Sequence, residues 1–281
     1  MPTQQPSRVA PHADTMAPPR RKTSPLSQTL KSEWVKIRTW RTGRGLMLAA
    51  PLVAGLASAA FVASVPLTMG RSPVDLTVRQ QLEVSMMGVD IANIITMVLA
   101  ILFVSTERVT NTLQLSLQLT PNRARYLAAK LCVFLLVTVG VSLVSVCFAA
   151  LCGRWVLGMM GVELPSLASP EVLQLLGGLL VLGPAHAVLG FACAVTFHSG
   201  LLAFLVVFFI MCLPSLASLL PGDLERGVSS LLFMPAIHSL AGTIAPDGVG
   251  YTPPALALGV IAVWVVVLCG IAVTSFQRQD L

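Results

Sequence analysis

The residues of this chain with the most reactive side chains are few, and their spacing matches none of the common catalytic motifs. The sequence has no G-x-x-x-x-G-K-[ST] loop to hold nucleotide phosphates and no H-E-x-x-H pair to bind zinc. It also lacks the G-x-S-x-G turn that exposes a serine nucleophile. His198 and Ser199 are neighbours in sequence, which is not a catalytic arrangement, because a triad is brought together by the fold. We therefore expect a protein that is not an enzyme and has no catalytic or metal-binding residues.

Three polar side chains interrupt apolar stretches of the sequence, namely Asp90, Asn93 and His186. Burying a charge at membrane depth is costly, so a residue such as Asp90 is by default a candidate for function. Asp90 and Asn93 are three residues apart, which places them on one face of a helix. We predict that the three side chains lie along a substrate path. The sequence also fits a hydrated boundary position for Asp90 and a purely structural His186.

The three polar residues lie within six long apolar stretches of the sequence, which must place them in the fold. Each has 20 to 27 residues, and about 20 helical residues cross a hydrocarbon core of roughly 30 Å. Hydrophobic residues make up 55 % of the chain and charged residues 11 %, well below the charge of a typical soluble domain. Because the stretches are continuously apolar and not alternating, we expect an all-α polytopic membrane protein. The predicted spans cover about 46–68, 85–105, 126–152, 172–196, 201–220 and 254–276.

The basic residues indicate how these spans are oriented. With the N-terminus in the cytoplasm, 14 of the 18 Lys and Arg residues lie on the inner side and 4 on the outer side. This positive-inside bias predicts a multi-pass protein of the cytoplasmic (plasma) membrane with both termini in the cytoplasm. The net charge of +6 therefore reflects topology, and we expect no nucleic-acid partner.

Two segments precede the first span. Residues 1–25 are rich in Pro, Ser, Thr and Arg, which predicts a disordered cytosolic tail, with Met16 as an alternative start. Residues 26–44 carry an apolar stripe at helical spacing beside basic side chains, including Lys36. We predict an amphipathic helix in the headgroup layer with its basic side chains on anionic lipid. Its characteristic residues are Leu30, Trp34, Ile37 and Arg38.

The connections between the spans carry the remaining information. Residues 106–125 form the only long inner loop, in which the leucines from 113 to 119 alternate as in a strand. A short helix that uses Val109, Leu113 and Leu117 fits the same residues, and periodicity alone does not choose between the two. The turn 197–200 is so tight that the flanking spans must form an antiparallel hairpin. The outer segment 221–253 is too short and too interrupted by proline to cross, but it can hold a helix buried against protein.

Two stretches of this sequence resemble the permease subunits of ABC-2-type (type V exporter) ABC transporters, especially those of high-GC Gram-positive bacteria. The resemblance covers roughly residues 26–281 and includes the span count, the tight turn and the long outer segment. Asn111 departs from the pattern, since family members often carry glycine there. The matching residues are L-K-S-E-W-V-K-I-R at 30–38 and the pattern Glu107, Thr112, Pro121, Arg123, Lys130.

The resemblance implies a permease domain over 26–281 in which 107–120 form a coupling helix that docks on a cytosolic ABC ATPase. Two copies of that ATPase, with ATP and Mg²⁺ bound there and no cofactor bound by this chain, would drive export. A second permease copy or a homologue would complete the assembly in the lipid. The implied cargo is hydrophobic or amphipathic, with drug or antibiotic efflux as the usual case. The implied coupling residues are Glu107, Arg108, Thr112, Leu113, Leu117, Pro121 and Arg123.

Two other functions fit a polytopic membrane protein. A secondary transporter driven by an ion gradient would show inverted repeats and charges near the membrane centre, and Asp90 is a weak match for the second feature. A scaffold or sensor subunit would work without an ATPase partner. An intramembrane enzyme is disfavoured by the missing motifs.

Overall fold

The computed structural model describes residues 25–110, 112–119, 122–163 and 165–278. Helices make up most of this part of the chain, which contains no strand, and six of them are long and apolar enough to span a membrane, so the predicted all-α fold with six spans is confirmed. The predicted disordered tail at 1–25 falls almost wholly outside the described residues, as does Pro121. The spanning helices are α2 (Arg41–Met69), α3 with α4 (Val78–Met86 and Gly88–Val109), α6 (Arg123–Met159), α7 (Pro170–Thr196), α8 (Gly200–Ala217) and α11 (Pro254–Arg278).

Five shorter elements complete the fold. They are α1 (Pro25–Thr39), the 3₁₀ turn η1 (Pro73–Asp75), α5 (Thr112–Leu119), α9 (Gly222–Ser229) and α10 (Phe233–Ala241). The helix expected over 26–44 ends at Thr39, because Trp40 adopts an extended backbone and α2 starts directly after it. The helix expected over 107–120 also divides: residues 107–109 form the last turn of α4, and α5 is a separate helix.

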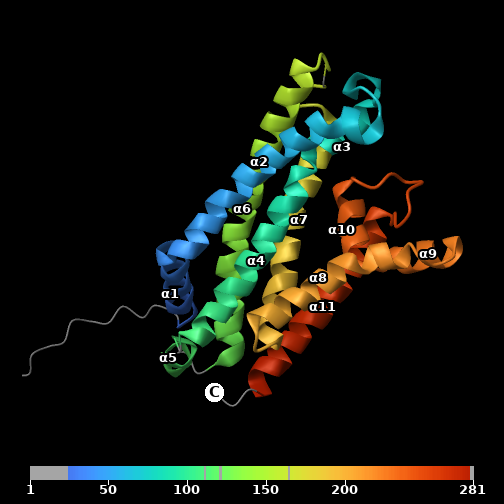
Figure 1. The fold of residues 1–281 in the computed structure, drawn as a ribbon. Coiled ribbons are helices and arrows are strands. Elements are labelled where there is room, and N and C mark those ends of the chain that lie inside the picture. Colours follow the sequence, from blue (N-terminus) through green and yellow to red (C-terminus); the bar gives the residue numbers. More distant parts are fainter. Residues whose placement is uncertain (1–24, 111, 120–121, 164, 279–281) are drawn as a thin grey trace, which may run out of the picture.

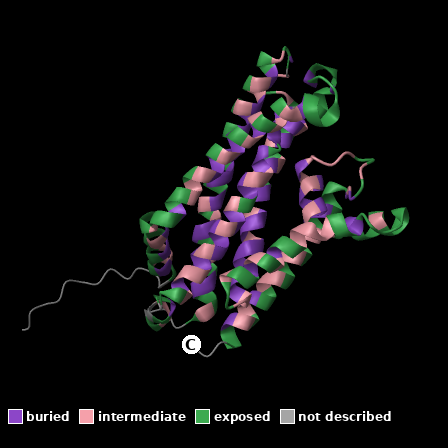
Figure 2. Ribbon diagram, in the orientation of Figure 1, coloured by how far each residue is buried: buried purple, intermediate pink, exposed green. Residues whose placement is uncertain are grey.

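The spanning helices are buried to very different degrees. In α7, 78 % of the most apolar window is buried inside the protein, compared with 17 % in α8 and 11 % in α11. Figure 1 shows α2, α4, α6 and α7 side by side, with α8 and α11 along one edge, and Figure 2 shows burial concentrated on the inner helices. Leu and Val side chains of α8 and α11 remain exposed, as expected where lipid replaces water as the neighbour.

Small residues allow the central helices to approach closely. The amide N–H of Gly88 in α4 donates to the Ser58 hydroxyl of α2 at 3.1 Å. A Cβ added at Gly88 would lie 2.1 Å from the Ala54 carbonyl oxygen, so only glycine fits at this crossing. Gly190 of α7 similarly faces the backbone of Met97 in α4. Close van der Waals packing at such crossings holds the helices together, because the hydrophobic effect contributes little between helices in lipid.

The segment between α8 and α11 contains two helices that are too short to span a membrane. Phe233 and Ile237 of α10 are buried, and α10 packs against α7 and α11. The Trp264 indole N–H of α11 donates to the Leu231 carbonyl just before α10, at 3.0 Å. The helical element that the sequence permitted at 221–253 therefore exists and is held against protein. Gly178 of α7 faces the backbone of Ala241 at the end of α10.

Gly177 and Gly178 provide a matched test of this packing. A Cβ at Gly178 would lie 2.3 Å from the Ala241 Cα, whereas one at Gly177 meets nothing within 4 Å. We expect Gly178→Ala to lower stability by about 1–3 kcal/mol through overpacking. Gly177→Ala should instead raise it by up to about 1 kcal/mol, since alanine is the better helix former. Thermal unfolding of the two variants in the same detergent measures both effects. Equal shifts of the same sign would show that α10 is not seated on α7 in this way.

Candidate functional site

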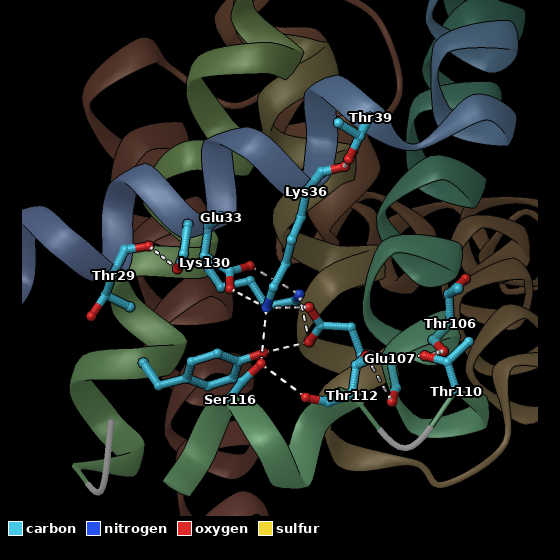
Figure 3. A network of polar contacts seen from close by, with 12 residues as sticks. Thr29, Glu33, Lys36, Thr39, Thr106, Glu107, Thr110, Thr112, Ser116 and Lys130 are labelled. Carbon is cyan, nitrogen blue, oxygen red and sulfur yellow. Dashed lines mark hydrogen bonds and ion pairs between the residues drawn. The ribbon is translucent and has the colours of Figure 1, made fainter. Parts of the chain in front are cut away.

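Four charged side chains form a closed ring at the end of the bundle where α1, α4, α5 and α6 meet, here called the α5 end (Figure 3). Glu33 and Lys36 come from α1, Glu107 from the last turn of α4, and Lys130 from the second turn of α6. Glu33, Glu107 and Lys130 are buried, and Lys36 is about two-thirds buried. Two carboxylates and two ammonium groups balance, so this charge ring has no net charge. Burial of charges is tolerated only with such pairing.

Each carboxylate of the charge ring contacts both ammonium groups. The Lys36 Nζ atom lies 2.6 Å from Glu33 Oε1 and 2.8 Å from Glu107 Oε1. The Lys130 Nζ atom lies 3.2 Å from Glu33 Oε2 and 2.9 Å from Glu107 Oε2. Positive and negative groups therefore alternate around the ring, which links three helices that are far apart in sequence.

Neighbouring side chains complete the polar contacts of the charge ring. The third donor of the Lys36 ammonium group bonds the Ser116 hydroxyl of α5 at 3.0 Å. The Tyr126 hydroxyl donates to Glu107 Oε2. The Lys130 ammonium group also lies 3.9 Å from the centre of the Phe103 ring, a favourable cation–π position. A fully satisfied buried network of this kind holds its helices in one arrangement.

Lys36 does not face lipid as predicted: its ammonium group points into the protein, because α1 docks its Glu33 face on α6. Burial acts to lower the pKa of Lys36, but the Glu107 and Glu33 carboxylates outweigh it and raise the pKa above 10.5. A raised pKa means that the ion pairs contribute stability below the usual pKa, and that this contribution is lost as pH rises through the higher value. Lys36 therefore keeps its positive charge throughout the neutral range.

The other residues of the predicted interfacial helix divide between two faces. Ile37 is buried and Leu30 packs against the core, whereas Trp34 and Arg38 are exposed. The exposed face remains the one predicted to meet lipid.

The short α5 settles the ambiguity of the inner loop in favour of a helix. Leu113 is buried and Leu117 is partly buried against the core, four residues apart on one face. Gln114 and Gln118, also four apart, are exposed, as is Thr112. A cavity of about 270 Å³ opens between α1, α4 and the start of α5, beside the charge ring.

Two arginines from the ends of this loop bind the C-terminal carbonyls of other spans. The Arg108 guanidinium donates to the carbonyls of Ala194, Val195 and Phe197 at the end of α7, at 3.0, 2.6 and 2.5 Å. The Arg123 guanidinium donates to the Phe276 and Gln277 carbonyls at the end of α11, both at 3.1 Å. The last carbonyls of a helix lack intrahelical partners, and a guanidinium satisfies several of them at once.

The three residues predicted to lie along a substrate path are separated from the charge ring. Two of them, Asp90 and Asn93, lie on α4, and His186 lies on α7. Asp90 lies in the first turn of α4 and Asn93 one turn further on, where Asn93 is buried close to Gly183 of α7. His186 is also buried, and its Nδ1 atom bonds the Leu182 carbonyl at 2.7 Å, which fits a structural role. Among the described residues, no group of three His, Cys, Asp or Glu side chains is placed to hold a metal ion.

Sequence reasoning missed the charge ring, although its members were visible. Lys36 was predicted to lie on lipid, and Glu33, Glu107 and Lys130 were noted only in the two stretches that resemble the permease family. The usable signal was Lys130 itself, since it falls four residues inside a predicted span, where a charge requires a partner. Which acids supply that partner depends on the packing of α1 against α6, which no local pattern reveals.

The fold and the charge ring define a multi-pass, all-α membrane protein whose polar site lies at one end of the bundle. A family model described as "ABC-2 family transporter protein" matches residues 29–215, which include the whole charge ring and α5. The chain thus belongs to the ABC-2 family of transporter proteins. No curated protein matches it.

The buried pair Glu33–Lys130 can be tested by removing one partner and then both. Lys130→Met leaves two carboxylates facing Lys36 alone, so we expect a loss of stability of about 3–5 kcal/mol. The double variant Glu33→Leu/Lys130→Met leaves Lys36 and Glu107 balanced and should recover most of that loss. Chemical unfolding in detergent micelles gives the three free energies.

The exposed pair Arg79–Glu83, at 2.8 Å, is the matched control. Glu83→Gln should cost less than about 1 kcal/mol, because exposed ion pairs contribute little. A double variant no more stable than Lys130→Met alone would contradict the pairing.

Proposed function

We propose that this chain is the transmembrane permease subunit of an ATP-driven exporter. Membership of the ABC-2 transporter family supports a permease, and the sequence contains no phosphate-binding loop of its own. A separate ATPase chain, present in two copies with ATP and Mg²⁺, supplies the energy. The single observation that carries the proposal furthest is the attachment of α5 to three other helices through the charge ring.

The α5 end faces the cytoplasm in this proposal. It contains α1, α5 and the termini of α4, α6 and α11, and the basic residues of the sequence gather there according to the positive-inside rule. The first and last described helices both have their free ends on this side. The protein is then a component of the cytoplasmic membrane with both termini in the cytoplasm.

The exposed face of α5 is the proposed docking surface for the ATPase. Gln114 and Gln118 point away from the core on one side of the helix, while Leu113 and Leu117 anchor the other side. Neutral polar side chains on a short, anchored helix suit a contact that must hold during repeated movement. The cavity of about 270 Å³ beside α5 provides a recess next to this surface.

Movement of α5 would reach most of the bundle through polar contacts. Ser116 connects α5 to Lys36, and the charge ring connects Lys36 to α4 and α6. Arg108 extends the connection to the end of α7, and Arg123 to the end of α11. In this mechanism Glu107 and Arg108 transmit force inside the permease and do not contact the ATPase directly.

A second permease copy or a homologue would complete the translocation path, with lipid around the exposed apolar faces. The cargo class that fits a helix bundle of this composition is hydrophobic or amphipathic, including drugs and antibiotics.

Charge introduced on α5 tests the docking surface. We expect Gln114→Glu/Gln118→Glu to weaken ATPase binding by about tenfold or more, because a charge mismatch in an interface costs several kcal/mol. The purified assembly in nanodiscs gives the affinity for the ATPase and the rate of ATP hydrolysis per permease.

The same substitution at the opposite end, Gln174→Glu, is the control, since Gln174 lies in an exposed part of α7. Docking on α5 is wrong if both variants bind the ATPase like the wild type. The exporter proposal as a whole is wrong if wild-type protein moves its cargo without any nucleotide-hydrolysing partner.

A further inference from the structure

At the end of the bundle away from α5, two titratable side chains from different helices face each other. Asp90, in the first turn of α4, and His238, in α10, both line a cavity of about 410 Å³ between α3, α4, α7 and α10. The His238 Nε2 atom lies 3.9 Å from Asp90 Oδ1, which is near enough for an ion pair but too far for a hydrogen bond. We call these two side chains the Asp90–His238 pair.

The C-terminal cap of α10 fixes the direction in which the His238 ring points. Gly242 ends the helix with a φ of 75°, and the Thr243 amide N–H then donates to the His238 carbonyl at 3.0 Å. The Thr243 hydroxyl donates to the same carbonyl at 3.0 Å and lies 3.0 Å from His238 Nδ1. Because a hydroxyl has one proton, both contacts are hydrogen bonds only when Nδ1 carries the ring N–H. In the neutral imidazole Nε2 is then an acceptor, and it faces Asp90.

A proton on Nε2 changes the contact between α4 and α10. Without that proton two acceptors face each other, and Asp90 Oδ1 is buried with no hydrogen-bond partner among the described residues. With it, Nε2 donates to Asp90 while Nδ1 keeps its bond to Thr243. Since a charge-assisted N–H···O bond is about 2.8 Å long, the pair closes by about 1 Å. The Asp90 side chain is about half exposed, so water can deliver the proton.

The other charged groups around the pair have their own partners or lie far away. On α3, Glu83 lines the same cavity, but its carboxylate is 2.8 Å from the Arg79 guanidinium. On α7, His186 is within electrostatic reach of His238, and its Nδ1 is bound to a backbone carbonyl at 2.7 Å. Helices α8 and α11 also pack on α10, and their sequences hold one charged residue, Arg278 in the last turn of α11. The carboxylate that meets a proton on His238 is therefore the one on α4.

The position of the pair gives its closure a mechanical effect. Helix α10 is already seated on α7 at Gly178 and on α11 through the Phe233–Trp264 ring contact. The pair reaches from α10 to α4, one turn after the joint between α3 and α4 at Met87. Shortening this contact draws two walls of the cavity together.

We propose that the Asp90–His238 pair is a proton-operated latch that holds α10 against α4 and narrows the cavity between them. Histidine is the side chain that ordinarily changes charge between about pH 5 and 8, so the latch responds to mild acidification. It adds stability at low pH and loses it as pH rises, as for any imidazole that gains a carboxylate partner on folding. The latch depends on this chain alone. If the exporter proposal holds, this end faces outward and the latch responds to the pH outside the cell.

Thermal unfolding in one detergent at about pH 5.5 and about pH 8 tests the latch. Asp90→Asn places an amide donor opposite the neutral Nε2, so it joins the two helices without a proton. We expect the wild type to gain about 3 °C or more over this variant on going from the higher to the lower pH. His238→Gln, which removes the titrating group, should lose the same pH-dependent gain.

Two further histidine variants are the controls. His198→Gln removes an exposed imidazole from the turn between α7 and α8, and His186→Gln removes the neighbouring buried one. Both should keep the wild-type response to pH, whatever their absolute unfolding temperatures.

Methionine oxidation reports on the cavity itself. Met86 lines the cavity and is 3 % exposed, whereas Met159 of α6 is 71 % exposed and serves as the internal reference. The full chain in nanodiscs is treated with hydrogen peroxide, and its peptides are quantified by mass spectrometry. We expect wild-type Met86, relative to Met159, to oxidise about threefold or more slowly at about pH 5.5 than at about pH 8. In Asp90→Asn the ratio should be the same at both pH values.

A wild-type pH response that persists in Asp90→Asn and His238→Gln would overturn the latch, as would a response that disappears in His186→Gln alone. Equal oxidation of Met86 at both pH values in the wild type would also overturn it, because protonation would then leave the cavity unchanged. A failure of the exporter proposal is separate, since it would show as absent ATPase coupling with the pH response intact.

Discussion

Two carboxylates and two ammonium groups buried together impose the strictest constraint on this molecule. Each charge of the ring formed by Glu33, Lys36, Glu107 and Lys130 is costly to bury alone, and each is neutralised by two neighbours. The helices that supply them must therefore keep one mutual arrangement at this end. Lys130 lies in the second turn of α6, so the start of α6 and the Glu33 face of α1 must meet beside the last turn of α4.

The rest of the bundle depends on contacts of a different kind. Helices α2, α4 and α7 approach through glycine and serine, whereas α8 and α11 keep apolar side chains on the outside. At the α5 end, the arginines at 108 and 123 bind the terminal carbonyls of α7 and α11, so the polar network extends beyond the charge ring. At the other end, a cavity of about 410 Å³ lies between α3, α4, α7 and α10.

The sequence predicted the features that depend on length, composition and local periodicity. The six spans and the all-α class follow from apolar runs, and each span is found within a few residues of its expected position, apart from the first three, which are longer than expected. The helix at 112–119 could not be distinguished from a strand, because leucine alternates there; burial of Leu113 and Leu117 decides it. The Lys36–Glu107 and His238–Asp90 contacts could not be predicted from sequence, since each joins residues separated by more than 70 positions. Tertiary packing alone creates them.

The charge ring has a consequence for how the polypeptide is made. All four of its members lie between residues 33 and 130, within the first half of the chain. Glu33 and Lys36 are synthesised first, Glu107 follows, and Lys130 comes last. Both carboxylates that pair with Lys130 therefore precede it in the chain. Lys130 enters the membrane after both of its carboxylate partners have been synthesised. All four charges are also present before α7, α8 and α11 are made, so the ring can form without the second half of the chain.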